Sequence, residues 1–290
     1  MGLASPVFAA PITVNDGQHE ITLPDAPKRV VVLEFSFADA LASVNVSPVG
    51  VADDNDGTRL PAEVREIIGK WTSVGTRGQP SIEAIAKLKP DLIVADLDRH
   101  RAVYDQLSAI APTMLLASRG EDYEGSLKSA AKIAEALGKT EEMKARLAKH
   151  RALMADYASK IPDGASIMFG ASREDSFSAH GPESYDGSVL ISLGVKVPEV
   201  QGKGKDAYNF VSIEQLLALN PDYLLVGHYR RPSIVDKWSK EPLWAALKAS
   251  KGKVFAVNEN VWARNRGIIA AEKIAADTLS ILNGTYKEAD

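Results

Sequence analysis

The sequence contains no cysteine in its 290 residues. This absence excludes disulfide scaffolds, iron–sulfur clusters, thiolate zinc sites and cysteine nucleophiles, and it also excludes a lipid-anchored cysteine within this chain. Long apolar runs are missing as well, because none approaches the ~20 residues that a membrane-spanning helix needs. A chain of this length can bury a sizeable core in each of two lobes.

An excess of positive charge is also absent. Lys and Arg number 34 and Asp and Glu number 38, which gives a formal net charge of −4. A general nucleic-acid binder is not expected from such a balance. Hydrophobic residues make up 45% and charged residues 25% of the chain, which is typical of globular proteins. At roughly 150 residues per domain, the length allows about two domains.

The signature motifs of several large enzyme classes are missing too. The chain has no P-loop, no H-E-x-x-H, no G-x-S-x-G, and no G-x-G-x-x-G after a strand. The acidic segment 53–57 does not fit a calcium loop, because its glycine falls fifth instead of sixth. We expect a protein that binds a ligand without catalysis, with no catalytic residue and no cofactor. A two-lobe enzyme, such as a glycosyltransferase, is the alternative from another class, and turnover would reveal it.

Short apolar runs alternate with helical stretches along most of the chain. This alternation is typical of βαβ units built on parallel sheets. It predicts an α/β protein with two Rossmann-like lobes, each with a central, mainly parallel sheet. The expected strands are residues 30–35, 48–52, 91–95, 113–117, 166–170, 223–226 and 254–257.

The middle of the chain has a different pattern. An amphipathic helix is expected over residues 126–138, and a second, longer helix over residues 140–161. About 22 residues at 1.5 Å each make a rod of roughly 33 Å. No glycine or proline interrupts it, so we expect a rigid connector. The predicted organisation is an N-terminal lobe, a connecting helix and a C-terminal lobe at residues 11–138, 139–161 and 162–290.

One internal repeat supports two lobes of the same topology. Residues 81–91 match residues 212–222 at a constant offset of 131, and each copy contains a helix, a Pro-Asp turn and an apolar strand. Glu83 and Glu214 occupy matching places, each the second residue after a serine that is suited to cap the helix. Helix-dipole compensation is the simplest explanation for such first-turn carboxylates.

Arginines follow the expected strands in both halves. Ligands of parallel α/β sheets bind at the carboxyl ends of the strands. Guanidinium groups bind carboxylates in a bidentate fork, and an adjacent hydroxyl adds a donor. We therefore expect a positively lined cleft that binds an anion rich in carboxylate oxygens, although any single arginine is more often a surface ion-pair partner. The candidate ligand-binding arginines are Arg77, Arg119, Arg173, Arg264 and Arg266. We expect the hydroxyls of Thr76, Ser118, Ser172 and Tyr229 to orient the ligand carboxylates. Tyr229 and Trp262 would add an aromatic wall, although ordinary packing is the alternative for each aromatic residue.

Two stretches resemble a known family. Residues 29–41, and residues 81–83 with 89–93, are similar to the hallmark segments of substrate-binding proteins of iron–siderophore ABC importers. The likeness extends from about residue 12 to residue 282. Further segments resemble the members of this family that bind iron(III) dicitrate. These segments are residues 35–41, 52–56, 73–77, 172–174, 228–230 and 262–268.

The resemblance implies two lobes, a shallow cleft with little lobe motion, and iron(III) dicitrate as ligand. The citrate shell supplies the oxygen ligands of the iron, so no protein side chain is expected to bind the metal. The resemblance also implies a monomer in the periplasm that delivers its ligand to the membrane permease of an ABC importer, with Glu83 and Glu214 contacting the permease. Another carboxylate-type siderophore and metal-free citrate remain alternative ligands. Residues 7–9 fit the end of a secretory signal peptide.

Overall fold

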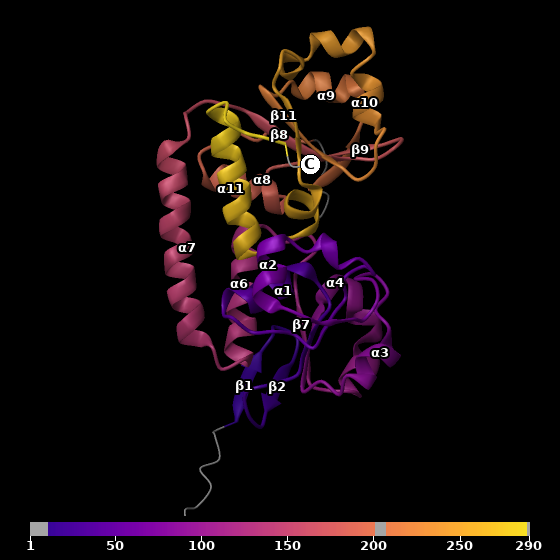
Figure 1. The fold of residues 1–290 in the computed structure, drawn as a ribbon, viewed down its shortest axis with the longest axis vertical. Helices are drawn as coiled ribbons and strands as arrows, with labels where there is room; N and C mark the ends of the chain where they lie inside the picture. The colour runs from indigo at the N-terminus through magenta and orange to yellow at the C-terminus, as the bar shows by residue number, and fades with distance from the viewer. Residues whose placement is uncertain (1–10, 201–206, 289–290) are drawn as a thin grey trace, which may run out of the picture.

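Two α/β lobes lie one above the other, with a long helix beside both of them (Figure 1). This computed structural model describes residues 11–200 and 207–288, so the expected cleavage segment at residues 7–9 lies outside the described residues. The chain enters the N-terminal lobe through an antiparallel hairpin of β1 (Ile12–Asn15) and β2 (Glu20–Leu23), which the sequence analysis missed. The expected two-lobe α/β fold is confirmed.

The N-terminal lobe has a five-stranded parallel sheet in the order β5-β4-β3-β6-β7. The strand order reverses between β3 and β6, and this reversal places a ligand-binding crevice at their carboxyl ends. The strands are β3 (Val30–Val32), β4 (Gly50–Val51), β5 (Thr72–Ser73), β6 (Leu92–Asp96) and β7 (Thr113–Leu116).

The C-terminal lobe repeats this order with five strands of its own, β10-β9-β8-β11-β12. Strands β8, β11 and β12 are parallel, whereas β9 is antiparallel to both of its neighbours. The sequence analysis missed β9 and β10, so the sheet is mainly but not wholly parallel. The strands are β8 (Ile167–Ser172), β9 (Phe177–His180), β10 (Tyr208–Val211), β11 (Tyr223–His228) and β12 (Val254–Val257).

Helices cover both faces of each sheet. The N-terminal lobe contains α1 (Phe35–Ser43), α2 (Ala62–Ile68), α3 (Ile82–Lys87), α4 (Leu97–His100), α5 (Tyr104–Ser108) and α6 (Tyr123–Ala136). The C-terminal lobe contains α8 (Tyr185–Ser192), α9 (Ile213–Leu219), α10 (Ile234–Trp238) and α11 (Ile268–Leu282). A short π-helix, Asn260–Arg264, precedes α11.

The long helix α7 runs over Thr140–Lys160, which is one residue shorter than expected. It packs against α6 and α11. His150, fully buried on its inner face, contacts the hydroxyl of Tyr123 and, at 2.8 Å, the carboxylate of Glu272. Arg146 reaches the same carboxylate in a bidentate pair at 2.7 and 2.9 Å. These polar contacts fix α7 against helices of both lobes.

The lobes are joined by more than α7. The largest cluster of buried apolar side chains runs through both lobes and includes residues of α1, α6, α8 and α11. Asp39 on α1 accepts hydrogen bonds of 3.1 Å from the backbone N–H groups of Ile269 and Ala270, in the first turn of α11. Gly267 allows this close approach, because a Cβ there would lie 2.1 Å from the carboxyl carbon of Asp39. A shared core therefore supports the lobe interface directly.

Candidate anion-binding site

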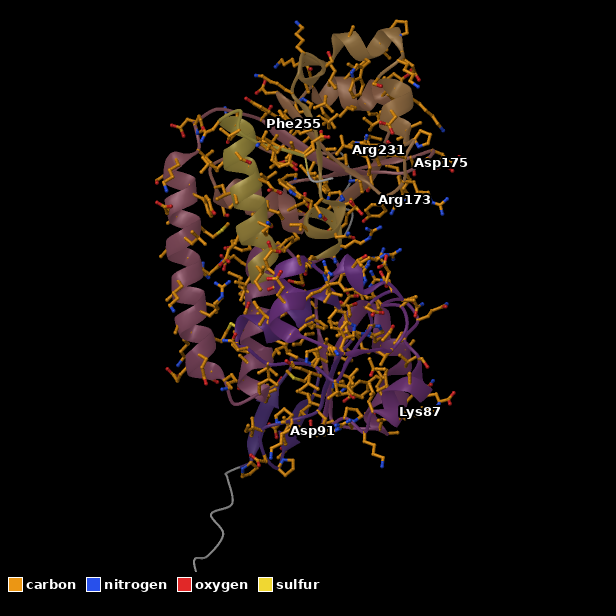
Figure 2. All side chains as sticks on the ribbon, in the orientation of Figure 1. Lys87, Asp91, Arg173, Asp175, Arg231 and Phe255 are labelled. Atoms are coloured by element: carbon orange, nitrogen blue, oxygen red, sulfur yellow. The ribbon has the colours of Figure 1, made fainter. Side chains whose placement is uncertain are left out.

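A cleft with a volume of about 480 Å³ lies between the two lobes. Segments that follow strands of both sheets line it, as expected at the crevice of a doubly wound sheet. Arg173, at the end of β8, marks the face of the C-terminal lobe that is turned toward the N-terminal lobe (Figure 2). Six of the ten candidate residues line this cleft, namely Arg77, Arg119, Arg173, Tyr229, Arg264 and Arg266.

Arginines dominate the lining. All five candidate arginines meet there, although they come from segments up to 189 positions apart. Two further arginines, Arg59 and Arg99, were missed by the sequence analysis. Arg99 lies in α4, directly after β6, so its position at a strand end was the signal that could have found it. Among the described residues, the cleft is lined by Arg59, Arg77, Arg99, Arg119, Arg173, Arg264 and Arg266.

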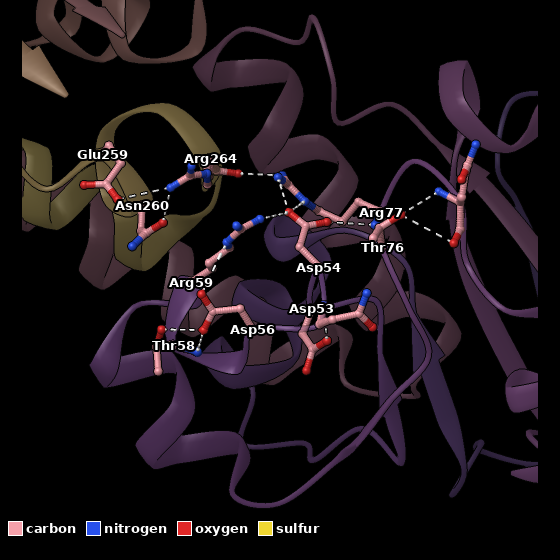
Figure 3. Close-up of polar contacts among 12 residues, drawn as sticks. Asp53, Asp54, Asp56, Thr58, Arg59, Thr76, Arg77, Glu259, Asn260 and Arg264 are labelled. Carbon is pink, nitrogen blue, oxygen red and sulfur yellow. Dashed lines mark hydrogen bonds and ion pairs between the residues drawn. The ribbon is translucent and has the colours of Figure 1, made fainter. Parts of the chain in front are cut away.

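Asp54 is the carboxylate that lines the cleft within the described chain. Its Oδ2 accepts hydrogen bonds from Nε and Nη2 of Arg77, at 3.1 and 2.8 Å, and lies 3.3 Å from Nη1 of Arg59 (Figure 3). Burial alone raises the pKa of Asp54, but the hydrogen bonds and charge of Arg77 outweigh it and hold the pKa below its usual value. Asp54 therefore stays ionised and fixes two of the cleft arginines.

Glu34 is a second carboxylate, fully buried beneath the cleft at the start of α1. One oxygen lies 2.7 Å from Nε of Arg99, and the other lies 3.6 Å from Nη1 of Arg77. Neither contact has the alignment of a hydrogen bond. Burial raises the pKa of Glu34, and the two guanidinium groups offset part of that increase. The buried carboxylate of Glu34 therefore holds two of the cleft arginines, Arg77 and Arg99.

Tyr229 organises the wall that belongs to the C-terminal lobe. The guanidinium carbon of Arg264 lies 4.0 Å from the centre of the Tyr229 ring, and that of Arg173 lies 4.6 Å from it. Nη1 of Arg264 is also held by Glu259, at 3.1 Å, and by Asn260, at 2.6 Å (Figure 3). The aromatic wall that the sequence suggested is therefore present at Tyr229.

Arg119, Arg173 and Arg266 differ from the other cleft arginines, because no carboxylate of the described residues forms an ion pair with them. Arg119 is exposed at the end of β7, and its backbone N–H donates to Asp96. Arg266 is buried, and its Nη1 has no hydrogen-bond partner in the described chain. An anion that enters the cleft therefore meets guanidinium groups whose charge is not yet neutralised.

Three of the four expected hydroxyl donors, Thr76, Ser118 and Ser172, are not among the residues that line this cleft, whereas the fourth, Tyr229, is. Ser118 and Ser172 are buried, and their hydroxyls contact Ser36 at 2.7 Å and the backbone N–H of Val235 at 3.4 Å. Thr76 accepts a hydrogen bond from the backbone N–H of Gln79 in its own turn. Their neighbours Arg77, Arg119 and Arg173 point into the cleft instead. The geometry does not support the expectation that these hydroxyls orient ligand carboxylates.

Trp262 also lies away from the cleft lining. Its ring is buried, 5.3 Å from the ring of Phe169, and its indole N–H donates to Asp277 at 2.9 Å. The expectation that Trp262 contacts the ligand is therefore replaced by a structural role in the core. For Trp262, the alternative of ordinary packing is the one that the structure supports.

Glu83 and Glu214 are exposed at equivalent positions of the two lobes. Each lies in the first turn of its helix, α3 or α9, after a serine whose hydroxyl caps that helix. Both helices lead into the fourth strand of the shared topological order, β6 or β11. Glu83 pairs with Lys87 at 2.7 Å, and the hydroxyl of Ser212 lowers the pKa of Glu214. The internal repeat thus corresponds to equivalent places in the two lobes.

Comparison with known proteins assigns the class. The model of the periplasmic binding protein family matches residues 30–260, and the chain belongs to this family. The chain is 53% identical over 280 residues to the Fe(3+) dicitrate-binding periplasmic protein FecB of Escherichia coli (strain K12), with 96% of this chain and 92% of that protein covered. It is 42% identical to the Fe(3+)-citrate-binding protein YfmC of Bacillus subtilis (strain 168), with 92% and 84% covered.

A solved structure agrees with these relatives. The iron uptake ABC transporter substrate-binding protein PiuA from Streptococcus pneumoniae Canada MDR_19A superposes with a TM-score of 0.78 at 25% identity, with 93% of this chain and 98% of that chain covered. The family resemblance stated from the sequence is therefore confirmed. No helix of the described residues is both long and apolar enough to span a membrane. The same residues contain no group of three or more His, Asp or Glu side chains suited to hold a metal ion.

Proposed function

We propose that this protein captures ferric dicitrate in the cleft between its lobes and delivers it to an ABC-type permease for iron uptake. The observation that carries the proposal is the convergence of seven arginines, contributed by both lobes, on one cleft of a chain whose net charge is −4. Two citrates carry more negative charge than one iron(III) balances, so the chelate is a polyanion. Guanidinium groups recognise its outer carboxylates in bidentate fashion.

The role of the protein in this proposal is binding without catalysis. Arg119, Arg173 and Arg266 supply positive charge that no carboxylate of the described chain pairs with, whereas Asp54 and Glu34 hold Arg77 and Arg99 in place. The citrate shell keeps the iron, so the protein contributes no ligand to the metal and no cofactor takes part. We propose a monomer in the periplasm, and the location is in keeping with the periplasmic relative FecB.

Delivery requires contact with the membrane permease subunits. We propose that Glu83 and Glu214, one on each lobe, form ion pairs with basic residues of the permease. Both carboxylates are exposed, and they occupy equivalent places in two lobes of the same topology. Two equivalent charges suit a permease built of two similar halves. The boundaries expected from the sequence, with lobes at residues 11–138 and 162–290 and a connecting helix at residues 139–161, stay a prediction.

Native mass spectrometry of the purified protein tests the ligand. Samples with ferric citrate, gallium citrate and metal-free citrate are compared, because the bound mass reports both the ligand and its stoichiometry. We expect complexes of the protein with iron(III) and two citrates and with its gallium analogue. Binding of metal-free citrate with equal affinity would support the alternative ligand instead.

A neutral chelate provides the matched control. A ferric hydroxamate without carboxylates leaves the cleft arginines without partners, so we expect it to bind poorly. Equal affinity for a neutral hydroxamate and for ferric citrate would remove the argument from charge recognition. Strong binding of another carboxylate-type siderophore, with weak ferric citrate binding, would favour the second candidate class of ligand.

A further inference from the structure

Tyr229 connects two of the arginines that the proposed site depends on. Its ring lies under the guanidinium groups of both Arg173 and Arg264, at 4.6 and 4.0 Å. Arginine side chains over an aromatic face are attracted by the ring, more strongly where water is partly excluded. These three side chains come from three different segments, after β8, after β11 and before α11, so the ring is the element that they share.

The backbone holds Tyr229 firmly against β8. Its N–H donates to the carbonyl oxygen of Ser172 at 2.9 Å, which continues the parallel pairing of β8 with β11. Its hydroxyl makes no hydrogen bond to any described residue. The backbone of Tyr229 is therefore fixed against β8, and within the described residues its ring stacks on arginines while its hydroxyl is unbonded, so the two parts of the side chain can be tested separately.

The two arginines depend on this ring to different degrees. Arg264 is also held by Glu259 at 3.1 Å and by Asn260 at 2.6 Å. The guanidinium of Arg173 has no ion pair or hydrogen bond to a side chain or carbonyl of the described residues, and the Tyr229 ring is its stacking partner. An arginine that no other group holds loses rotamer freedom when it binds a ligand, and prior stacking reduces that loss.

We propose that Tyr229 is a positioning residue for Arg173, which acts through the face of its ring and not through its hydroxyl. The inference rests on the proposed function, because it assumes that Arg173 contacts the carboxylates of the ligand. It changes the role that the sequence suggested for Tyr229, namely orientation of the ligand by the hydroxyl. It also assigns Arg173 and Arg264 different dependence on Tyr229, although both arginines line the same cleft.

A double-mutant cycle measures the dependence. Tyr229→Phe keeps the ring, so ferric citrate affinity stays within about twofold of wild type, whereas Tyr229→Leu lowers it about tenfold. In the background of Arg173→Ala, Tyr229→Leu has little further effect. In the background of Arg264→Ala, it keeps most of its effect. A loss with Tyr229→Phe equal to that with Tyr229→Leu, or equal losses in both backgrounds, would overturn the proposal.

A second measurement needs no ligand. The order of the arginine side chains is followed by relaxation of their Nε resonances in the unliganded protein. We expect Tyr229→Leu to increase the motion of Arg173 and to leave Arg264 unchanged, and Tyr229→Phe to restore Arg173. Unchanged order at Arg173 in Tyr229→Leu would refute the inference, even if ferric citrate binds. If wild-type protein fails to bind ferric citrate while the order changes as expected, the proposed function fails and the positioning role stands.

Discussion

Nη1 of Arg77, in the N-terminal lobe, donates a hydrogen bond of 3.3 Å to the carbonyl oxygen of Arg264, in the C-terminal lobe. The same guanidinium lies 4.0 Å from the centre of the Phe35 ring and forms ion pairs with Asp54 and Glu34. Arg77 therefore contributes to the fold as well as to the charge of the cleft. Replacing such an arginine should lower both the stability of the protein and its affinity for the ligand, whereas replacing an arginine that contacts only the ligand should lower the affinity alone.

The first prediction follows from this double role. Arg77→Ala leaves the buried Glu34 with one ion-pair partner fewer, so we expect the free energy of unfolding to fall by about 1–3 kcal/mol. Ferric citrate binding weakens in the same variant. Urea unfolding and equilibrium binding measure the two effects. Unchanged stability would mean that Arg77 does not support Glu34.

The second prediction concerns arginines that no carboxylate of the described chain holds. Arg119→Ala or Arg173→Ala should weaken ferric citrate binding by about 1.5–3 kcal/mol each, the scale of a charged hydrogen bond. The melting temperature should hardly change, because neither side chain supports the core. Wild-type affinity in both variants would remove these residues from the site.

The control for these arginine variants has to avoid the lobe interface. Arg146 is unsuitable, because its bidentate pair with Glu272 ties α7 to α11. Arg151→Ala is better matched, since Arg151 is exposed on the same helix and pairs with Glu124 at the surface. Surface pairs of this kind contribute little. We expect Arg151→Ala to change neither affinity nor stability by much.

A third prediction concerns pH. Burial raises the pKa of Asp39 to about 6 from 3.8, although the N–H groups of Ile269 and Ala270 oppose that increase. The folded protein therefore holds this proton more tightly than the unfolded chain. The protonated Asp39 therefore contributes to the free energy of unfolding below about pH 4. This contribution, about 3 kcal/mol in all, is lost as the pH rises through about 6.

Asp39→Asn tests this sign. The amide keeps an acceptor for the first turn of α11 and cannot ionise, so the variant should gain stability relative to wild type as the pH rises from 4 to 7. Urea unfolding at several pH values measures the difference. Asp163→Asn, at an exposed position after α7, removes the same charge away from the lobe interface and serves as the control. Parallel curves for Asp39→Asn and wild type would show that Asp39 does not titrate in this range.

The fourth prediction concerns permease docking. Replacing both Glu83 and Glu214 by Ala should leave ferric citrate affinity unchanged, because both side chains are exposed in the first turns of α3 and α9. Uptake of iron by cells should be abolished, because each lobe loses its contact with the permease. Uptake assays at matched protein levels provide the measurement.

Two exposed carboxylates outside the repeat supply the control for docking. Glu66 and Glu241 lie on α2 and just before the Pro242–Ala246 turn, and replacing both by Ala removes the same charge. Normal uptake is expected in that variant. Normal uptake in the variant that lacks Glu83 and Glu214 would leave helix capping as the full explanation of those two residues.

The fifth prediction concerns lobe motion. Helix α7 is uninterrupted from Thr140 to Lys160, and a shared core joins α1, α6, α8 and α11 across the lobes. We expect small-angle scattering to show almost no compaction when ferric citrate binds, in contrast to proteins with flexible hinges. A decrease of several per cent in the radius of gyration would be inconsistent with so rigid a connection.

Much of the fold was predictable because buried parallel strands leave continuous apolar runs in the sequence. The run at Val254–Val257 became β12 without any shift, and the long helix ended within one residue of its expected limit. Strands β9 and β10 escaped because Ser178, His180 and Asn209 interrupt their apolar residues, so neither strand leaves a continuous apolar run. The strand expected at residues 30–35 ends at Val32. Glu34, the single charge in that apolar run, is instead the residue that precedes α1.

The lining of the cleft was predictable in five of its seven arginines, and the serine and threonine hydroxyls that were expected beside them lie elsewhere. The carboxyl ends of parallel strands meet at one edge of a sheet, so arginines after several strands had to come together there. Neighbouring residues of an extended chain point in opposite directions, and the sequence analysis ignored this. Because Arg173 faces the cleft, Ser172, the last residue of β8, faces the interior. The stacking on Tyr229 required three-dimensional contacts that no spacing reveals.

The concentration of arginines in one crevice also affects how quickly an anion arrives. Charge of one sign in a concave, partly water-excluding site focuses the electric field outward and can raise association rates by about 10- to 1000-fold. The rest of the chain carries net negative charge, since the whole chain has a net charge of −4 despite the seven arginines of the cleft. A polyanion is therefore repelled by the rest of the molecule and attracted to the opening of the cleft. Added salt should slow this capture much more than it speeds release.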